Sequence, residues 1–336
     1  MSKKENSEEK IKFEDKTMKK RVYGILGISS IMANWNADFS GYPKSISDGR
    51  IFGSDKAFKY PMKKLWVDIG EKVLYIKSMK LEKDKKNEVT LIPRTLKERY
   101  EHLFGEGSLT KSKNAEEVLK NLFETVDVKN FGATFAEAGN NLSITGAVQI
   151  GQGFNKYEDT DTSEQPIMSP FRNSKNKTSQ EDEAEENAKA TTLGRKIVST
   201  EAHYFYSFNI NPLAYKEYVD LGITEGYTEE DYKLFKKTSM TSATSFATNS
   251  KVGCENEFGL FVETEPEVYL PNLAEYVKFI KADEEKNIIE LTCGDLINAF
   301  GAKIKSVEIY YNVETTVIKH NIEKVKEYNI ITQKEV

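Results

Sequence analysis

The stretch NWNADFSGYPKSISDGRIFGSDKAFKYPMKK, residues 34–64, carries the strongest indication of the fold. It joins an apolar, strand-like segment to a lysine-rich one through a polar turn that contains glycines. Backbone N–H groups in such a turn and at a helix N-terminus attract anions, and lysines add flexible positive charges. The stretch holds no obvious catalytic set. It therefore predicts a cradle for a phosphate backbone.

The segment before this turn, RVYGILGISSIMAN (residues 21–34), is rich in apolar and β-branched side chains. Gly24 and Gly27 interrupt it, and a glycine inside a strand permits another backbone to come close. The pattern predicts a buried strand in the centre of a sheet.

After the turn, Ser54 and Asp55 can cap a helix through their side-chain oxygens. The apolar residues at helical spacing that would pack on the sheet are Phe58, Met62 and Leu65. The lysines that would share another face of this helix are Lys56, Lys59 and Lys63. Pro61 removes one backbone donor, so we expect the helix to kink or split there.

The rest of the chain alternates between strand and helix patterns, which predicts an α+β sandwich of ferredoxin type. Strands are expected at 73–77, 196–210, 257–263 and 303–318, and a hairpin at 131–154. Helices are expected at 96–104, 115–126, 227–247, 273–281 and 293–300. Residues 155–192 are polar and poor in core side chains, as in a projecting arm or a mobile loop, and the charged run 79–88 favours a solvated loop.

Composition limits the function classes. The 336 residues carry 38% hydrophobic and 30% charged side chains and a net charge of -5, which is typical of a water-soluble protein whose basic groove, if present, is local. No apolar run is long enough for a membrane span and the opening lacks a secretion signal, so we expect a cytoplasmic protein that does not bind membranes. Cys254 and Cys293 are distant from each other and predict buried thiols, without a disulfide or zinc site.

Several segments together resemble the Cas-seven family of the RAMP superfamily, the backbone subunit of CRISPR Cascade complexes, and within it the type I-B subgroup. The resemblance covers about two thirds of the chain in the expected order. The segments that carry it are residues 21–36 leading into the polar turn, S-D-x-x-F-K-x-x-M-K at 54–63, FGATFA at 131–136, ITGAVQIGQG at 144–153 and FNIN at 208–211.

The resemblance implies a hand-shaped fold. A palm similar to an RNA-recognition motif (RRM), within a single domain at 19–336, would carry helical fingers inserted at about 80–130. A β-hairpin thumb would lie at about 155–195, and residues 1–18 would form a flexible N-terminus.

The same resemblance implies a guide-binding subunit without enzymatic activity, cofactor or metal. Copies of it would polymerise along the spacer of the CRISPR RNA (crRNA) and present the spacer for pairing with a target DNA strand in antiviral defence. Its other partners would be further Cascade subunits and a separate helicase-nuclease. Guide-directed systems leave sequence reading to base pairing, which fits a lysine cradle.

Lys59 and Lys63 match the family's basic pair on the first palm helix, and Met168 and Phe171 in the thumb are candidate wedges against a nucleotide stack. The candidate RNA-binding residues are Asn36, Arg50, Lys56, Lys59, Lys63, Ser250 and Lys251. The acidic run 181–186 would face solvent or a basic partner.

Two alternatives remain. Similar type III proteins cut target RNA with an aspartate in the loop after the first strand, where this chain has Asp38, and a metal would be needed to activate water. Alternatively, EFGLFV at 257–262 faintly resembles the aromatic strand of a single-strand RNA-binding module, although Phe258 and Phe261 fit a core better. The histidines predicted at surface or core positions, rather than catalytic ones, are His102, His203 and His320.

Overall fold

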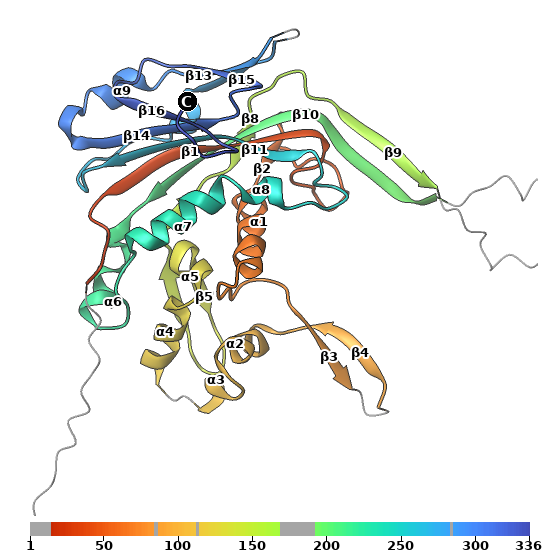
Figure 1. The fold of residues 1–336 in the computed structure, drawn as a ribbon. Helices are drawn as coiled ribbons and strands as arrows, with labels where there is room; N and C mark the ends of the chain where they lie inside the picture. Colours follow the sequence, from red (N-terminus) through yellow and green to blue (C-terminus); the bar gives the residue numbers. More distant parts are fainter. Residues whose placement is uncertain (1–14, 84–86, 112–113, 169–191, 283–284) are drawn as a thin grey trace, which may run out of the picture.

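The computed structural model describes residues 15–83, 87–111, 114–168, 192–282 and 285–336. Within them, a nine-stranded sheet dominates an α+β fold (Figure 1). Its strands are β1 (Arg21–Ala33), β2 (Phe52–Gly53), β7 (Val148–Ile150), β8 (Gly153–Asn155), β9 (Thr162–Met168), β10 (Thr192–Ile210), β11 (Cys254–Thr264), β14 (Ile304–Tyr311) and β16 (Val325–Asn329). The main path runs β16-β14-β11-β1-β10-β8-β2, and β7 and β9 also pair with β10.

Strand β1 is central, as predicted, and pairs antiparallel with both β10 and β11. Its glycines are required by close neighbours. A Cβ on Gly24 would lie 2.0 Å from the carbonyl oxygen of Leu260, and one on Gly27 would lie 2.7 Å from the Cβ of Phe258. Alternate β1 side chains enter the two hydrophobic cores on the opposite faces of the sheet: Val22 and Leu26 enter one, and Tyr23 and Ile25 enter the other.

Helices cover one face of this sheet, and a second sheet together with the short helix α9 (Gly294–Asn298) lies over the other (Figure 1). The helices are α1 (Asp55–Asp68), α2 (Leu96–Phe104), α3 (Ser108–Lys111), α4 (Ala115–Phe123), α5 (Val126–Phe131), α6 (Lys216–Asp220), α7 (Glu229–Ser239), α8 (Ser242–Ser245) and α9 (Gly294–Asn298). The second sheet has the order β12 (Val277–Ile280), β13 (Asn287–Leu291) and β15 (Thr316–Lys319). Two small hairpins pair β3 (Met79–Lys83) with β4 (Val89–Pro93), and β5 (Gly132–Phe135) with β6 (Leu142–Thr145).

Helix α1 begins as predicted, because the Ser54 side chain accepts a hydrogen bond from the Ala57 N–H. Its buried face consists of Phe58, Met62 and Trp66, so Trp66 takes the place predicted for Leu65. The helix is not split at Pro61 but continues to Asp68. Phe258 and Phe261 are both buried, which confirms their prediction as core residues.

The strand predicted at 73–77 is wrong. Val73 and Leu74 are buried, but the backbone there is irregular. The Asp127 carboxylate accepts hydrogen bonds from the backbone N–H groups of Leu74 and Tyr75, each at 2.8 Å. A side chain of α5 thus satisfies the donors that a neighbouring strand would otherwise bind.

Three further assignments change. The segment 273–281 is strand β12 preceded by a short 3-10 turn, and not a helix, because Val277 and Phe279 alternate into the core with β13 as partner. The segment 303–318 divides into β14 and β15, which belong to different sheets. The charged run 79–88 contributes β3 of an exposed hairpin, where a loop was predicted.

The long hairpin of β9 and the N-terminal half of β10 extends away from the sheet (Figure 1), in agreement with the predicted arm. We call its described residues, 162–168 and 192–199, the projecting hairpin. Residues 169–191, with Phe171 and the acidic run, lie outside the described residues, as do residues 1–14. Met18 is buried and its N–H donates to the Tyr227 carbonyl, so the packed part of the chain includes residues before 19.

Candidate functional site

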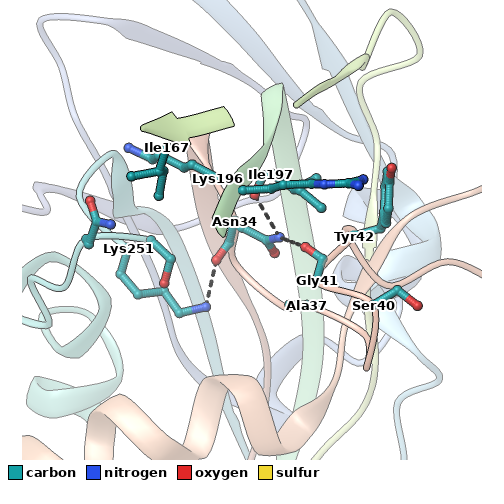
Figure 2. A pocket seen from close by; sticks show the side chains of 12 residues that line it. Asn34, Ala37, Ser40, Gly41, Tyr42, Ile167, Lys196, Ile197 and Lys251 are labelled. Carbon is teal, nitrogen blue, oxygen red and sulfur yellow. Dashed lines mark hydrogen bonds between the residues drawn. The ribbon is translucent and has the colours of Figure 1, made fainter. Parts of the chain in front are cut away.

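A cleft of about 540 Å³ lies where the loop after β1 meets the base of the projecting hairpin and the turn before β11 (Figure 2). Three segments far apart in sequence form it, each placed by the central pairing of β1 with β10 and β11. The residues that line it are Asn34, Ala37, Ser40, Gly41, Tyr42, Ile167, Arg195, Lys196, Ile197, Asn249, Ser250 and Lys251.

Asn34 connects the three walls of the cleft. Its side-chain amide donates to the carbonyl oxygens of Gly41, at 2.9 Å, and Ile197, at 3.1 Å. Its backbone N–H donates to the carbonyl of Ser250 at 2.9 Å. The polar turn that the sequence singled out is therefore fastened to both the projecting hairpin and the 249–251 turn.

Lys251 lies against the end of β1 and is largely buried. Its ammonium donates to the Asn34 carbonyl at 2.7 Å and to the Trp35 carbonyl, and it stands 5.4 Å from the centre of a Trp35 ring. Burial lowers its pKa. Among the described residues no carboxylate lies within 4 Å of its ammonium, so the charge of Lys251 is not neutralised by an ion pair there.

Asp38, the residue considered for metal-assisted cleavage, shapes the turn at the cleft. Its Oδ1 accepts hydrogen bonds from the backbone N–H groups of Ser40, at 2.8 Å, and Tyr42, at 3.0 Å. In the part of the chain that the structure describes, no three His, Cys, Asp or Glu side chains gather as a metal site. The geometry thus gives Asp38 a role in holding the backbone of Tyr42.

The two lysines of the predicted basic pair lie on α1 beside α5, and both are engaged within the chain. The Lys59 ammonium is 3.0 Å from the Asp55 carboxylate and 5.0 Å from the centre of the Phe131 ring. The Lys63 ammonium is 3.2 Å from the carboxylate of Asp127, whose side chain is fully buried. Their part in RNA binding stays a prediction.

The other predicted residues are distributed around α1 and the cleft. Lys56 is exposed on the first turn of α1. Asn36 accepts a hydrogen bond from the Ser54 N–H at 2.7 Å and so links the polar turn to the start of α1. Arg50 is exposed, is paired with Asp48 at 2.9 Å and lies over the Phe154 ring. Of the predicted set, only Ser250 and Lys251 line the cleft.

Of the two predicted wedge residues, the structure describes Met168, at the end of β9, where it is 55% exposed. Both cysteines are buried and free, as predicted. Tyr42, Arg195 and Lys196, which line the cleft, were not among the predicted site residues. Their only sequence signals were an aromatic residue in the polar turn and two adjacent basic residues at the start of a predicted strand, and neither reveals the register that brings them together.

Lys196, Arg195 and Lys251 place three cations on the cleft, and none of the described residues that line it is acidic. The fold and the site thus define a class of α+β protein with a basic cleft at the base of a projecting hairpin. Comparison makes the class specific: the family described as CRISPR-associated protein Cas7 matches residues 20–293, and the chain belongs to this family. The family that the sequence resemblance indicated is thereby confirmed.

The fold is similar to that of a chain in a solved structure titled "CRISPR RNA-guided surveillance complex, pre-nicking". The two have a TM-score of 0.54 and 13% sequence identity, over 93% of this chain and 97% of that chain. No curated protein matches the sequence. Among the described helices, none is long and apolar enough to cross a membrane.

Proposed function

We propose that this chain is a crRNA-binding backbone subunit of a Cascade-type surveillance complex, of type I-B, and that it has no catalytic activity. The observation that carries the proposal is the match of residues 20–293 to the Cas7 family. The likeness in fold to a chain of an RNA-guided surveillance complex supports it.

The geometry supports a grip on the backbone of the guide. Among the described residues, three cations and no carboxylate line a cleft that also offers the hydroxyls of Ser40, Tyr42 and Ser250, which suit phosphate oxygens. The sheet with α1 and α7 would be an RRM-like palm, the segment from β3 to α5 the fingers, and the projecting hairpin the thumb. Binding by such groups is electrostatic and independent of base sequence.

We propose the same partners that the resemblance implies. Copies of the chain would line up along the crRNA together with other Cascade subunits and would present the spacer to a target DNA strand. A separate helicase-nuclease would then cut the DNA. The protein would act in the cytoplasm.

Gel filtration of the full chain with and without a guide transcript tests this proposal. We expect an RNA-dependent oligomer, with equal affinity for guides of unrelated spacer sequence and with affinity that falls steeply as salt rises. A chain that stays monomeric with the transcript at low ionic strength would contradict the proposal.

A further inference from the structure

One carboxylate on the projecting hairpin binds two residues of the cleft. Glu164 of β9 accepts a hydrogen bond from the Tyr42 hydroxyl, 2.6 Å from its Oε2. Its Oε1 lies 2.8 Å from the guanidinium of Arg195 on β10. Glu164 thus joins the loop after β1 to the projecting hairpin at the edge of the cleft, although it is not itself among the lining residues.

The two groups that bind Glu164 are well placed to hold an anion. Tyr42 belongs to the turn fixed by Asp38, whose backbone N–H donates to the Tyr42 carbonyl at 2.8 Å while its carboxylate accepts from the Tyr42 N–H. Arg195 is anchored in the β9–β10 pairing. A guanidinium and a hydroxyl on separate rigid segments form the kind of donor pair that recognises a carboxylate or a phosphate.

The ion pair that holds Glu164 is exposed and therefore weak. The Arg195 side chain is 66% exposed and that of Glu164 35% exposed. Exposed pairs of this kind contribute little to stability. A phosphodiester group presents two non-bridging oxygens that share one negative charge, as the oxygens of a carboxylate do, so it can replace Glu164 on the same donors at little cost to the fold.

We propose that Arg195 and Tyr42 form a subsite for a phosphodiester group of the guide RNA, and that Glu164 occupies this subsite until RNA replaces it. This inference rests on the proposed function. Glu164 then acts as an internal competitor. In the free protein it keeps the loop after β1 fastened to the projecting hairpin. In the complex the RNA backbone makes that connection.

The test measures the affinity of the full chain for a fluorescent guide transcript by anisotropy. Glu164→Gln removes the competing charge and is expected to tighten binding by about two- to fivefold, the range that an exposed ion pair permits. Glu158→Gln is the matched control, because Glu158 is exposed in the segment that leads into β9 and the change in net charge is the same. It is expected to leave affinity unchanged.

Arg195→Ala and Tyr42→Phe test the subsite itself. Arg195→Ala should weaken binding and reduce the slope of log K against log salt by about 0.7, the loss of one phosphate contact on a single strand. Tyr42→Phe should weaken binding with no change in that slope. In the Arg195→Ala background, Glu164→Gln should no longer tighten binding, because the charge that it releases is gone.

Three outcomes would overturn the inference. The first is equal affinity of the Glu164→Gln and Glu158→Gln proteins for the guide transcript. The second is tighter guide binding by Glu164→Gln that persists in the Arg195→Ala background. The third is an effect of Glu164→Gln on capture of complementary DNA by guide-loaded protein with guide binding unchanged, which would assign the subsite to target DNA. If the wild-type chain binds no guide at low salt, the proposed function itself fails.

Discussion

The chain carries two groups of cations near the polar turn, and they differ in what holds them. On α1, Lys59 and Lys63 are paired with carboxylates of their own chain. In the cleft, Lys251 donates to backbone carbonyls, and Lys196 has no ion pair among the described residues. Arg195 is held there by Glu164 in an exposed ion pair. Lysines at helical spacing therefore predict that their side chains share one face of a helix. Whether that face has a positive potential depends on carboxylates that the fold brings close from elsewhere in the chain.

The largest expected effect tests the internal role of Lys63. In Lys63→Glu a second carboxylate would stand beside buried Asp127, which also binds the backbone of Leu74 and Tyr75. Breaking a buried pair costs about 3–5 kcal/mol, so the free energy of unfolding measured in urea should fall by that amount. RNA binding of this variant is then meaningful only under conditions where it is folded.

The matched control is Lys59→Glu on the same helix. Asp55, its partner, is partly exposed, so the loss should be smaller than for Lys63→Glu. Equal losses in the two variants would show that Asp127 does not depend on Lys63, and the contrast between α1 and the cleft would lose its basis.

Asp127 also shows which part of the fold could not be predicted from the sequence. The central strand, the Ser54 cap and the strand at 196–210 depend on local pattern, and the structure bears them out, as it does the described part of the arm predicted at 155–192. The strand predicted at 73–77 failed because its backbone donors bind a carboxylate 52 residues or more away in sequence. Long-range partners of this kind are not encoded in local pattern.

The candidate site divides in the same way. Ser250 and Lys251 were found because the family resemblance placed them near the RNA path. Tyr42, Arg195 and Lys196 were missed because they meet only through the register of β1 with β10 and of β10 with β9. The hydrophobic pattern restricts that register, but local pattern does not say which strands pair, so the meeting of these three residues could not be predicted.

The next expected effect concerns β10 where it continues from the projecting hairpin into the main sheet. Buried His203 of β10 lies between Glu257 on β11, at 2.7 Å, and Glu201, at 3.0 Å, and stacks on Phe279. Burial alone would lower the pKa of His203, but the two carboxylates outweigh it and the pKa is raised. Lys281, paired with Glu201 at 2.8 Å, is the other charge at this cluster.

A raised pKa means that the folded state binds the proton more tightly than the unfolded state. The stabilisation should be complete below about pH 6.5, the usual value for histidine, and should be lost as pH rises through the folded pKa. Each pH unit between the unfolded and folded pKa values of His203 contributes about 1.4 kcal/mol to the free energy of unfolding. Urea midpoints of wild type and His203→Gln measured from acid to alkaline pH should therefore converge as pH rises, and a constant difference would argue against a charged imidazole.

A smaller effect, on RNA affinity, distinguishes a lysine in the cleft from a lysine on a remote surface. Lys196→Glu should weaken binding of the guide transcript by about tenfold at low salt, since a free cation that meets a phosphate is replaced by a repelling charge. Lys326→Glu on β16, at the opposite end of the sheet from β2, has the same change in net charge and should alter affinity little. Equal weakening by both would indicate a general charge effect without a specific cleft.

The smallest effect is expected at Lys56, the exposed lysine of the α1 group. Because no ion pair within the described residues depends on it, Lys56→Glu should change the free energy of unfolding by less than about 0.5 kcal/mol. This variant can therefore report on RNA contact by α1 without disturbing the fold. If the RNA path follows the cleft alone, its affinity should fall less than that of Lys196→Glu; an equal or larger fall would extend the path along α1 and restore the predicted basic row to the interface.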